Sequence, residues 1–336
     1  MRAWQYSTAA GGLEKNLTLH NDVPLPPLST RPTDAEILVE VLSASLNPAD
    51  YKVPELGLVA RAMIRLPATP GMDFCGRVAQ TTPAARDAFP VGALVFGRLD
   101  ATQHGTCAGY TVAPAASCAL VPEGVEVDWA ASVGCAGQTA FQPIAQTAKA
   151  GDRVFINGGS GGTGTFGIQI AKALGCHVSV SCSTGKVALC KSLGADEVFD
   201  YTATDVVQAL KEGGATYALC VDNVGEPAGL YQAAHHFLLP AGKFVQVGAG
   251  TSWEAAKTLT SRLLLPSFMG GGKRKFEFFR MTGNKPEDLE QMAKWMADGT
   301  IKPVIEEVFE FEDLPKAFAK LRQGRNAGKF VIHVGK

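Results

Sequence analysis

A glycine-rich stretch, residues 158–167 (GGSGGTGTFG), follows the apolar run 153–157 and precedes a segment with helical spacing of Phe166, Ile170 and Leu174. Backbone that binds a pyrophosphate must approach its oxygens closely, and glycine has no Cβ to obstruct that approach. A plain turn is also rich in glycine, but the strand before and the helix after favour a phosphate site. The expected contacts are Gly159, Ser160, Gly161, Gly162, Thr163 and Gly164.

The next strand ends in Ser181-Cys182-Ser183-Thr184-Gly185-Lys186, without a carboxylate. An NAD-binding protein would place Asp or Glu there, about 20 residues beyond the glycines, to hold the ribose hydroxyls. Hydroxyls with a lysine suit a 2′-phosphate, so Ser183 and Lys186 predict NADPH. Tyr201 is expected to cover the adenine or touch this phosphate. The alternatives are that Lys186 belongs to a solvated helix start and Tyr201 to plain surface.

Two further strands end in 222–225 (DNVG) and 247–250 (VGAG). In an open α/β sheet, ligands bind at the carboxyl ends of the strands. We therefore expect these loops to line the nicotinamide side of the cofactor. The expected contacts are Asn223, Val224, Val247, Gly248 and Ala249.

Strands alternating with helix-length segments from residue 122 predict a doubly wound parallel sheet, a Rossmann domain. Its expected strands are 153–157, 177–181, 197–199, 218–222, 243–247 and an edge strand 275–281. Residues 1–121 contain short apolar runs broken by proline and glycine, which indicates β-rich structure. The tail after 283 is expected to pack back on that half. The prediction is an α/β protein with one domain from 1–121 and 284–336 and another from 122–283.

Composition excludes several classes of protein. Lys and Arg number 31 against 32 Asp and Glu, which excludes nucleic-acid binding by bulk charge. The short basic run 273–275 reads as a solvated connector. Eight cysteines without a Cys-x-x-Cys pair are typical of a reducing compartment. Since no apolar run approaches the roughly 20 residues of a membrane span and no leader is evident, we expect a cytoplasmic protein.

Several motifs occur in a specific order: LNPADYK at 46–52, PGMDFCG at 70–76, CAGQTA at 135–140, the glycine loop, LGADEV at 193–198 and GKFV at 328–331. Over essentially the whole length, the sequence resembles the zinc-independent quinone-oxidoreductase branch of the medium-chain dehydrogenase/reductase superfamily. Within it, the sequence is most similar to the reticulon-interacting and chloroplast-envelope quinone-oxidoreductase-like proteins. The resemblance implies that the β-rich domain is a GroES-like catalytic domain. It also implies NADPH contacts at Pro48, Asp50, Thr139 and Lys329.

Zinc-dependent members of the superfamily hold their catalytic metal with Cys, His and Cys. The resemblance matches these positions to Asn47, Met72 and Cys135. One thiolate cannot supply the three protein ligands of an open catalytic zinc site, so no metal is expected.

Without a Lewis acid, hydride transfer is easiest to an acceptor whose C=C is conjugated to a carbonyl, because the arriving charge delocalises onto oxygen. We expect NADPH-dependent reduction of quinones or α,β-unsaturated carbonyls by hydride transfer to the β-carbon. The resemblance places the candidate hydrogen-bond donors Asn47, Tyr51 and Lys52 on the loop facing the nicotinamide. For Tyr51 and Lys52, contact with the pocket or the cofactor is favoured over an obligatory acid role. For Asn47, an Asn-Pro turn with Asp50 capping the following short helix is an equal alternative.

Apolar residues in the loops 51–66 and 251–275 favour a small hydrophobic carbonyl or quinone substrate, with plain packing as an equal alternative. Two other functions remain open: an enoyl reductase of a biosynthetic, polyketide-type pathway, and a non-catalytic NADPH-binding protein that acts by interaction. Pairing of the Phe-rich edge strand 275–281 across a two-fold axis predicts a homodimer.

Overall fold

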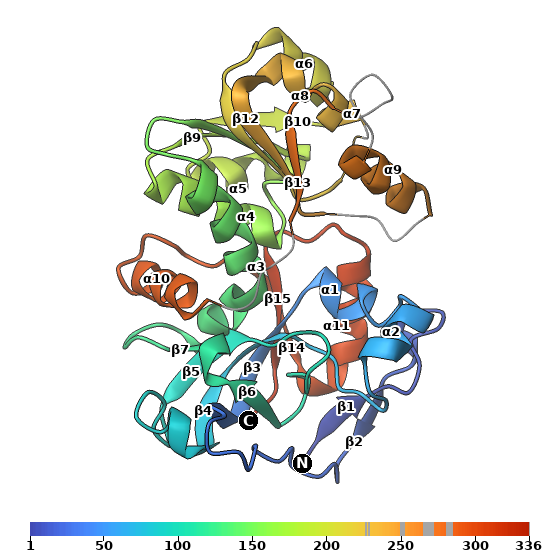
Figure 1. Cartoon of the computed structure of the whole chain (residues 1–336), viewed down its shortest axis with the longest axis vertical. Helices are drawn as coiled ribbons and strands as arrows, with labels where there is room; N and C mark the ends of the chain where they lie inside the picture. The colour runs from blue at the N-terminus through green and yellow to red at the C-terminus, as the bar shows by residue number, and fades with distance from the viewer. Residues whose placement is uncertain (226, 228, 249–252, 265–271, 280–284, 336) are drawn as a thin grey trace. The chain divides into compact units, whose positions relative to one another are not determined.

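The chain forms two compact units in a computed structural model (Figure 1). One comprises Met1–Gln138 and Gly283–Lys336, and the other Thr139–Thr282. Helix α3 (Val127–Thr147) contributes residues to both units, so the domain boundaries at 121/122 and 283/284 stay a prediction. No described helix is long and apolar enough to cross a bilayer. The structure describes residues 1–225, 227, 229–248, 253–264, 272–279 and 285–335.

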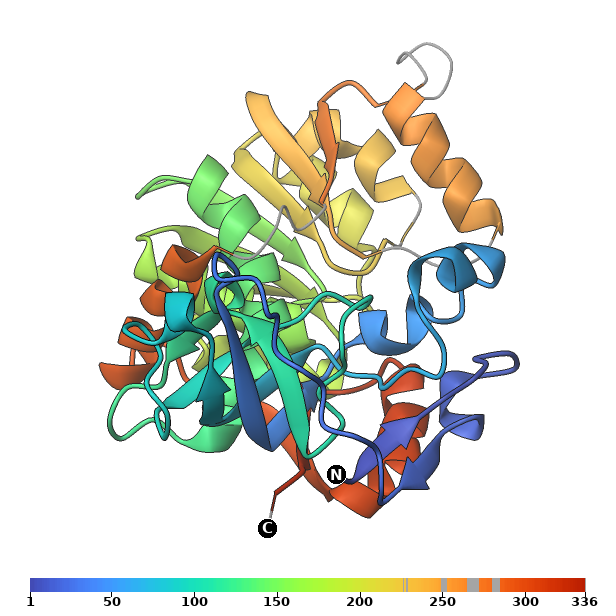
Figure 2. The same ribbon diagram turned by 60° about the horizontal axis from the view of Figure 1, so that its bottom comes forward.

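The second unit is built on a six-stranded parallel sheet, as the sequence predicts. The strand order is β10-β9-β8-β11-β12-β13, which is the doubly wound dinucleotide-binding order. Figure 1 and Figure 2 show β13 beside β12 at the sheet edge. Residues 280 and 281 of the predicted edge strand lie outside the described residues. The strands are β8 (Arg153–Asn157), β9 (His177–Cys182), β10 (Glu197–Asp200), β11 (Tyr217–Asp222), β12 (Leu238–Gln246) and β13 (Lys275–Phe278).

Helices cover both faces of this sheet, which explains why its strands are apolar without alternation. Phe155 of β8 packs edge-on against Phe237 and Tyr217 on one face. Its neighbour Ile156 lies on the other face, next to Gly167 of α4. The helices are α4 (Gly162–Ala173), α5 (Val187–Ser192), α6 (Val206–Glu212), α7 (Gly229–Gln232), α8 (Ala234–Phe237) and α9 (Trp253–Leu264).

The first unit contains a seven-stranded sheet around the long strand β3 (Glu36–Leu46). The order is β14-β15-β3-β4-β5-β7, and β6 also pairs with β3. Strand β15 of the tail lies antiparallel to β3, which confirms that the tail packs on the N-terminal half. The other strands are β4 (Asp73–Thr81), β5 (Leu94–Arg98), β6 (Tyr110–Pro114), β7 (Cys118–Leu120), β14 (Ile305–Glu310), β15 (Lys329–His333) and the pair β1 (Ala3–Gln5) and β2 (Thr18–His20).

Within residues 1–121 the two α-helices are short, α1 (Pro48–Lys52) and α2 (Leu58–Met63). The first unit also contains part of α3 and the tail helices α10 (Pro286–Ala297) and α11 (Leu314–Arg322). Short 3₁₀ turns are Leu13–Lys15, Pro83–Ala85, Ala115–Ser117 and Phe311–Asp313 here, and Thr184–Lys186 in the second unit. Helix α10 buries Leu289, Met292, Ala293 and Met296, which lie on one face at i, i+3, i+4 and i+7 spacing.

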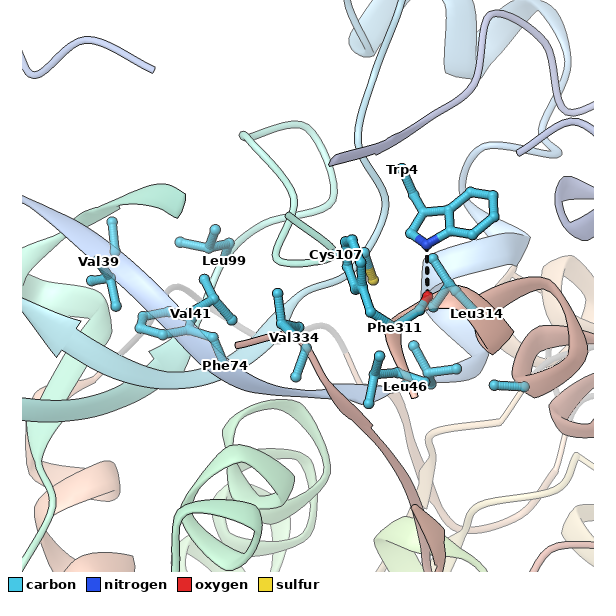
Figure 3. Close-up of a cluster of buried hydrophobic side chains, with 14 of the residues drawn as sticks. Trp4, Val39, Val41, Leu46, Phe74, Leu99, Cys107, Phe311, Leu314 and Val334 are labelled. Atoms are coloured by element: carbon cyan, nitrogen blue, oxygen red, sulfur yellow. Dashed lines mark hydrogen bonds between the residues drawn. The ribbon is translucent and has the colours of Figure 1, made fainter. Parts of the chain in front are cut away.

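A hydrophobic cluster joins the two ends of the chain within the first unit (Figure 3). Val39 and Val41 of β3 and Phe74 of β4 belong to it, together with residues of the tail. The indole Nε1 of Trp4 donates to the backbone carbonyl of Phe311 over 2.8 Å. This cluster therefore fixes the tail, including β15, on the N-terminal strands.

Candidate active site

The glycine loop in the second unit connects β8 to α4 by a path that demands glycine. Gly158 has φ 79°, a conformation that side chains disfavour. A Cβ on Gly164 would lie 2.2 Å from the carbonyl oxygen of Gly158, so α4 can start here only without a side chain. No side chain caps α4 at Gly161. Its first-turn N–H groups therefore suit an anion, which is the arrangement that a pyrophosphate needs.

The residues predicted to read the 2′-phosphate come together at the ends of β9 and β10. Register pairs Cys182 with Asp200, and the N–H of Tyr201 donates to the carbonyl of Cys182 over 3.1 Å. Ser183 follows β9 directly, and Lys186 closes the short 3₁₀ turn. Tyr201 is 59% exposed, so its ring is available to a ligand.

Asp200 is a neighbour of this corner that the sequence analysis did not single out. Its carboxylate accepts hydrogen bonds from the hydroxyls of Thr184 (2.6 Å) and Thr202 (2.7 Å). These bonds lower the pKa of Asp200. The Asp200 carboxylate is thus bound by hydroxyl groups close to it in sequence or space. It ends the third strand of this unit, whereas the acid of an NAD-binding protein would follow the second strand.

The loop after β11 is held by a buried carboxylate. One oxygen of Asp222 accepts from the side chain of Asn157 (2.8 Å) and from the N–H groups of Val224 (3.1 Å) and Gly225 (2.8 Å). Burial raises the pKa of Asp222. The N–H groups of Val247 and Gly248 donate to the backbone carbonyl of Asp222, which brings both predicted loops together. Ala249 lies outside the described residues.

Asn223 is the member of this loop best suited to a ligand. Its amide oxygen and nitrogen are both buried without a hydrogen-bond partner among the described residues. Unpaired buried polar atoms cost free energy, so they indicate a missing partner. A carboxamide, which offers one donor and one acceptor, would satisfy both atoms. Together with the glycine loop, this amide makes the second unit fit a nicotinamide dinucleotide.

The predicted catalytic residues lie in the first unit, where Asn47 precedes α1. Asn47 is buried, and both ends of its amide are engaged. Its Oδ1 accepts from Lys329 Nζ over 2.6 Å, and its Nδ2 donates to Asp73 Oδ2 over 2.8 Å. Asp50 accepts the backbone N–H of Asn47 over 2.6 Å, so the predicted helix-capping interaction of Asp50 is present.

Asp73, the first residue of β4, is the centre of a buried polar cluster that also contains Asn47, Ser45 and Lys329. Its carboxylate also accepts from Ser45 Oγ (3.0 Å) and from the backbone N–H of Cys135 (2.7 Å), and it pairs with Lys329 Nζ at 3.3 Å. Burial, and then the negative charge of Asp73, raise the pKa of Asp50 to about 8. Burial, and then Asp73, raise the pKa of Cys135 to about 12, so this thiol stays protonated.

Asp73 was missed by sequence reasoning, and Lys329 was expected to contact the cofactor. The structure places Lys329 in the buried cluster, 2% exposed, while its proposed cofactor contact stays a prediction. The sequence did contain an indication of the role of Asp73. This charged residue begins an otherwise apolar strand, and a buried charge needs a partner of opposite charge.

Tyr51 and Lys52 are the last two residues of α1, and their neighbours differ from those of Asn47. The Tyr51 ring lies under the guanidinium of Arg322, 4.4 Å from the ring centroid, and Arg322 also bonds Glu14 and Glu55. Burial raises the pKa of Tyr51 and lowers that of Lys52. Lys52 is therefore a stronger acid than a solvated lysine. Of the remaining predicted contacts, Pro48 opens α1, and Thr139 is buried in α3.

The predicted substrate loop 51–66 forms an apolar surface around α2. Leu58, Val59 and Met63 are exposed. Next to them, a cavity of about 240 Å³ is lined by residues that include Tyr6, Ala60 and Ile64. Much of the second predicted loop, 251–275, lies outside the described residues.

Comparison with known protein families shows which superfamily the chain belongs to. Residues 33–225 match the alcohol dehydrogenase GroES-like domain, and residues 193–332 match the zinc-binding dehydrogenase domain. The chain belongs to the medium-chain dehydrogenase/reductase superfamily. It is an oxidoreductase of that superfamily, and both the predicted family and the predicted fold class are confirmed.

Three relatives illustrate the range of this superfamily. The chain is 45% identical to the trans-enoyl reductase pgmF of Aspergillus terreus, over 99% of this chain and 96% of the relative. It is 30% identical to the 2-methylene-furan-3-one reductase of Solanum lycopersicum, over 99% and 79%. The solved quinone oxidoreductase of Coxiella burnetii shares 28% identity, with a TM-score of 0.83 over 100% and 99% of the two chains.

The residues of the cluster do not fit the zinc site that the family description implies. The three matched positions carry an amide, a thioether and a single thiol, in Asn47, Met72 and Cys135, whereas an open catalytic zinc site needs three protein ligands. Within the described part of the chain, no three His, Cys, Asp or Glu side chains group together as metal ligands.

Proposed function

We propose that this oxidoreductase uses NADPH to reduce a C=C bond conjugated to a carbonyl, with quinones as related acceptors. The observation that carries the proposal is the cluster at the matched metal positions, where Asn47 binds Lys329 and Asp73. Such a site cannot polarise an isolated carbonyl as zinc does. An acceptor already activated by conjugation needs only hydrogen-bond donors for the charge that develops on its oxygen.

NADPH would supply the hydride, and the chain's residues would hold and orient the reactants. The glycine loop and α4 would bind the pyrophosphate, and Ser183, Lys186 and Tyr201 would bind the 2′-phosphate. Asn223 would pair with the carboxamide.

Asn47, Tyr51 and Lys52 are the proposed donors to the substrate oxygen. Asn47 retains one N–H beyond its bond to Asp73, because an amide nitrogen has two. Lys52 suits a hydrogen-bond or proton donor because burial lowers its pKa. Single substitutions of Asn47, Tyr51 and Lys52 by apolar residues of similar size test these roles, and unchanged turnover in all three would reject them.

The second candidate is an enoyl reductase that acts on a biosynthetic, polyketide-type acyl intermediate. The whole-length similarity to a trans-enoyl reductase favours it. The exposed apolar residues of α2 and the adjacent cavity support a hydrophobic substrate in either case.

An NADPH-oxidation assay with a quinone, a short enal and a long enoyl thioester separates these functions. Mass spectrometry should find the product two hydrogens heavier, and 4-²H-labelled NADPH should place deuterium at the β-carbon. Preference for the thioester would favour the biosynthetic function. Tight NADPH binding without turnover of any acceptor would favour the third possibility, a non-catalytic interaction protein.

We also propose a cytoplasmic homodimer. The eight cysteines are all free thiols, which supports a reducing compartment. Strand β13 ends the sheet of the second unit and offers an edge for pairing. Light scattering that shows a monomer at micromolar concentration would refute the dimer.

A further inference from the structure

Arg262 is a buried arginine of α9 to which nothing above gives a role. It is 4% exposed, and its Nη1 donates to Gln246 Oε1. Its guanidinium lies 5.8 Å from the centre of the Tyr231 ring. Burial of a guanidinium costs free energy unless its N–H groups and its charge are compensated. The groups around Arg262 therefore indicate why an arginine occupies this position.

Gln246 connects Arg262 to the loop after β12. While its Oε1 accepts from Arg262, its Nε2 donates to the carbonyl oxygen of Gly248 over 2.9 Å. The N–H of Gly248 in turn donates over 3.0 Å to the carbonyl oxygen of Asp222, the last residue of β11. Continuous hydrogen bonds thus join a side chain of α9 to both loops that are proposed to line the nicotinamide.

Asp222 provides a second connection to Arg262, through charge. Its buried carboxylate accepts the N–H groups of Val224 and Gly225 and so fixes the loop that carries Asn223. Burial raises the pKa of Asp222 and lowers that of Arg262, and in each case the charge of the other residue opposes the effect of burial. The two buried charges therefore stabilise each other. Both amide atoms of Asn223 are without a hydrogen-bond partner among the described residues, so the loop is held with this amide ready for a ligand.

We propose that Arg262 couples the position of α9 to occupation of the nicotinamide site and is a positioning residue for the loop that carries Asn223. A carboxamide bound to Asn223 would restrain the loops after β11 and β12, and the bond between Arg262 and Gln246 would transmit this restraint to α9. Coupling between two sites is reciprocal, so the attachment of α9 by Arg262 strengthens cofactor binding by the same factor. The inference rests on the proposed NADPH site and not on the proposed reaction.

A purely structural role for Arg262 would be to pack α9 against the Tyr231 ring. Arg153 is the matched comparison, because its guanidinium also lies over a tyrosine ring, 5.1 Å from the centre of Tyr217. Arg153 is the first residue of β8, so it lies at the end of the parallel sheet opposite to the nicotinamide loops. Its substitution removes a similar ring contact without touching those loops.

Fluorescence titration with NADPH measures the effect of Arg262 on the cofactor. Arg262→Met and Gln246→Met should each weaken NADPH binding at least about 10-fold. The double variant should bind no more weakly than the weaker single variant, because both changes break the same connection. Arg153→Met should bind NADPH as wild type does. Wild-type affinity in Arg262→Met, or losses that add in the double variant, would overturn the proposal. If Arg262→Met does not fold, Gln246→Met decides by itself.

Hydrogen exchange of α9 measures the effect of the cofactor on the helix. Saturating NADPH should slow exchange of the amide groups of residues 257–264 at least about 10-fold in wild type and Arg153→Met, but less than about twofold in Arg262→Met. Equal slowing with and without Arg262, or no slowing in wild type, would overturn the coupling. Neither measurement uses turnover, so a protein that binds NADPH and reduces no acceptor would contradict the proposed reductase alone. A wild-type protein that binds neither NADPH nor NADH would contradict both.

Discussion

Gly161 and Gly164 lie three residues apart in the phosphate loop, but an added side chain would clash at position 164 and fit at position 161. An alanine Cβ at position 164 would lie 2.2 Å from the Gly158 oxygen and 2.6 Å from a backbone carbon of Gly159. Backbone cannot move aside cheaply, and overpacking of this kind costs about 1–3 kcal/mol. At position 161 the nearest atom is 3.9 Å away and φ is −76°, so alanine fits.

We therefore expect Gly164→Ala to destabilise the protein by about 1–3 kcal/mol in urea unfolding. Gly161→Ala should cost less than about 1 kcal/mol, the difference between glycine and alanine at a helix N-cap. It should nevertheless weaken NADPH binding at least about tenfold, equivalent to about 1.4 kcal/mol, because its Cβ faces the proposed pyrophosphate.

Fluorescence titration with NADPH and urea unfolding of the same samples provide the two readouts. Gly213→Ala, at the C-terminal end of α6, is the matched control, since its φ is −68° and the nearest atoms to the added Cβ lie at 3.6 Å. Wild-type NADPH affinity in Gly161→Ala would refute the placement of the pyrophosphate at α4. Wild-type stability in Gly164→Ala would refute the steric argument.

Three further predictions concern the cofactor, the fold and pH. Lys186→Ala should weaken NADPH binding about 10- to 100-fold and leave NADH binding nearly unchanged, as removal of one charge-assisted contact implies; equal losses for both cofactors would contradict the 2′-phosphate role. Trp4→Phe should lower the free energy of unfolding by about 1 kcal/mol through loss of the bond to Phe311, measured with urea, and no change would show that this bond contributes nothing net. Asp50 has its pKa raised from 3.8 to about 8, so the folded protein binds its proton more tightly than the unfolded chain, and this group makes stability fall as pH rises between about 4 and 8. Asp50→Asn should flatten that part of the pH–stability profile; an unaltered slope would assign it to other groups.

Local patterns predicted the second unit well. Its six strands, the glycine loop and the start of α4 follow from apolar runs and glycine spacing, which are set by neighbours in sequence. The grouping of Ser183, Lys186 and Tyr201 needed only one parallel pairing of β9 with β10. Asp200 escaped notice because its carboxylate contacts depend on the turns that follow each strand, and turn conformation is poorly encoded in residue type.

In the first unit, sequence motifs placed Asn47 and Asp50 at the start of α1, and the capping bond of Asp50 was foreseeable from their spacing. The partner of Asn47 was not foreseeable, because Lys329 is 282 residues away. A lysine before an apolar strand reads as surface unless its strand is known to lie in the middle of a sheet.

The amino-acid sequence by itself determined a dinucleotide fold and a β-rich companion domain, since these depend on residue type and short-range spacing. Only the tertiary structure decided what occupies the centre of the first unit. The pairing of β15 and β4 with β3 brings an ammonium and a carboxylate together beside Asn47. Burial then makes that ion pair obligatory, because neither charge is stable there alone.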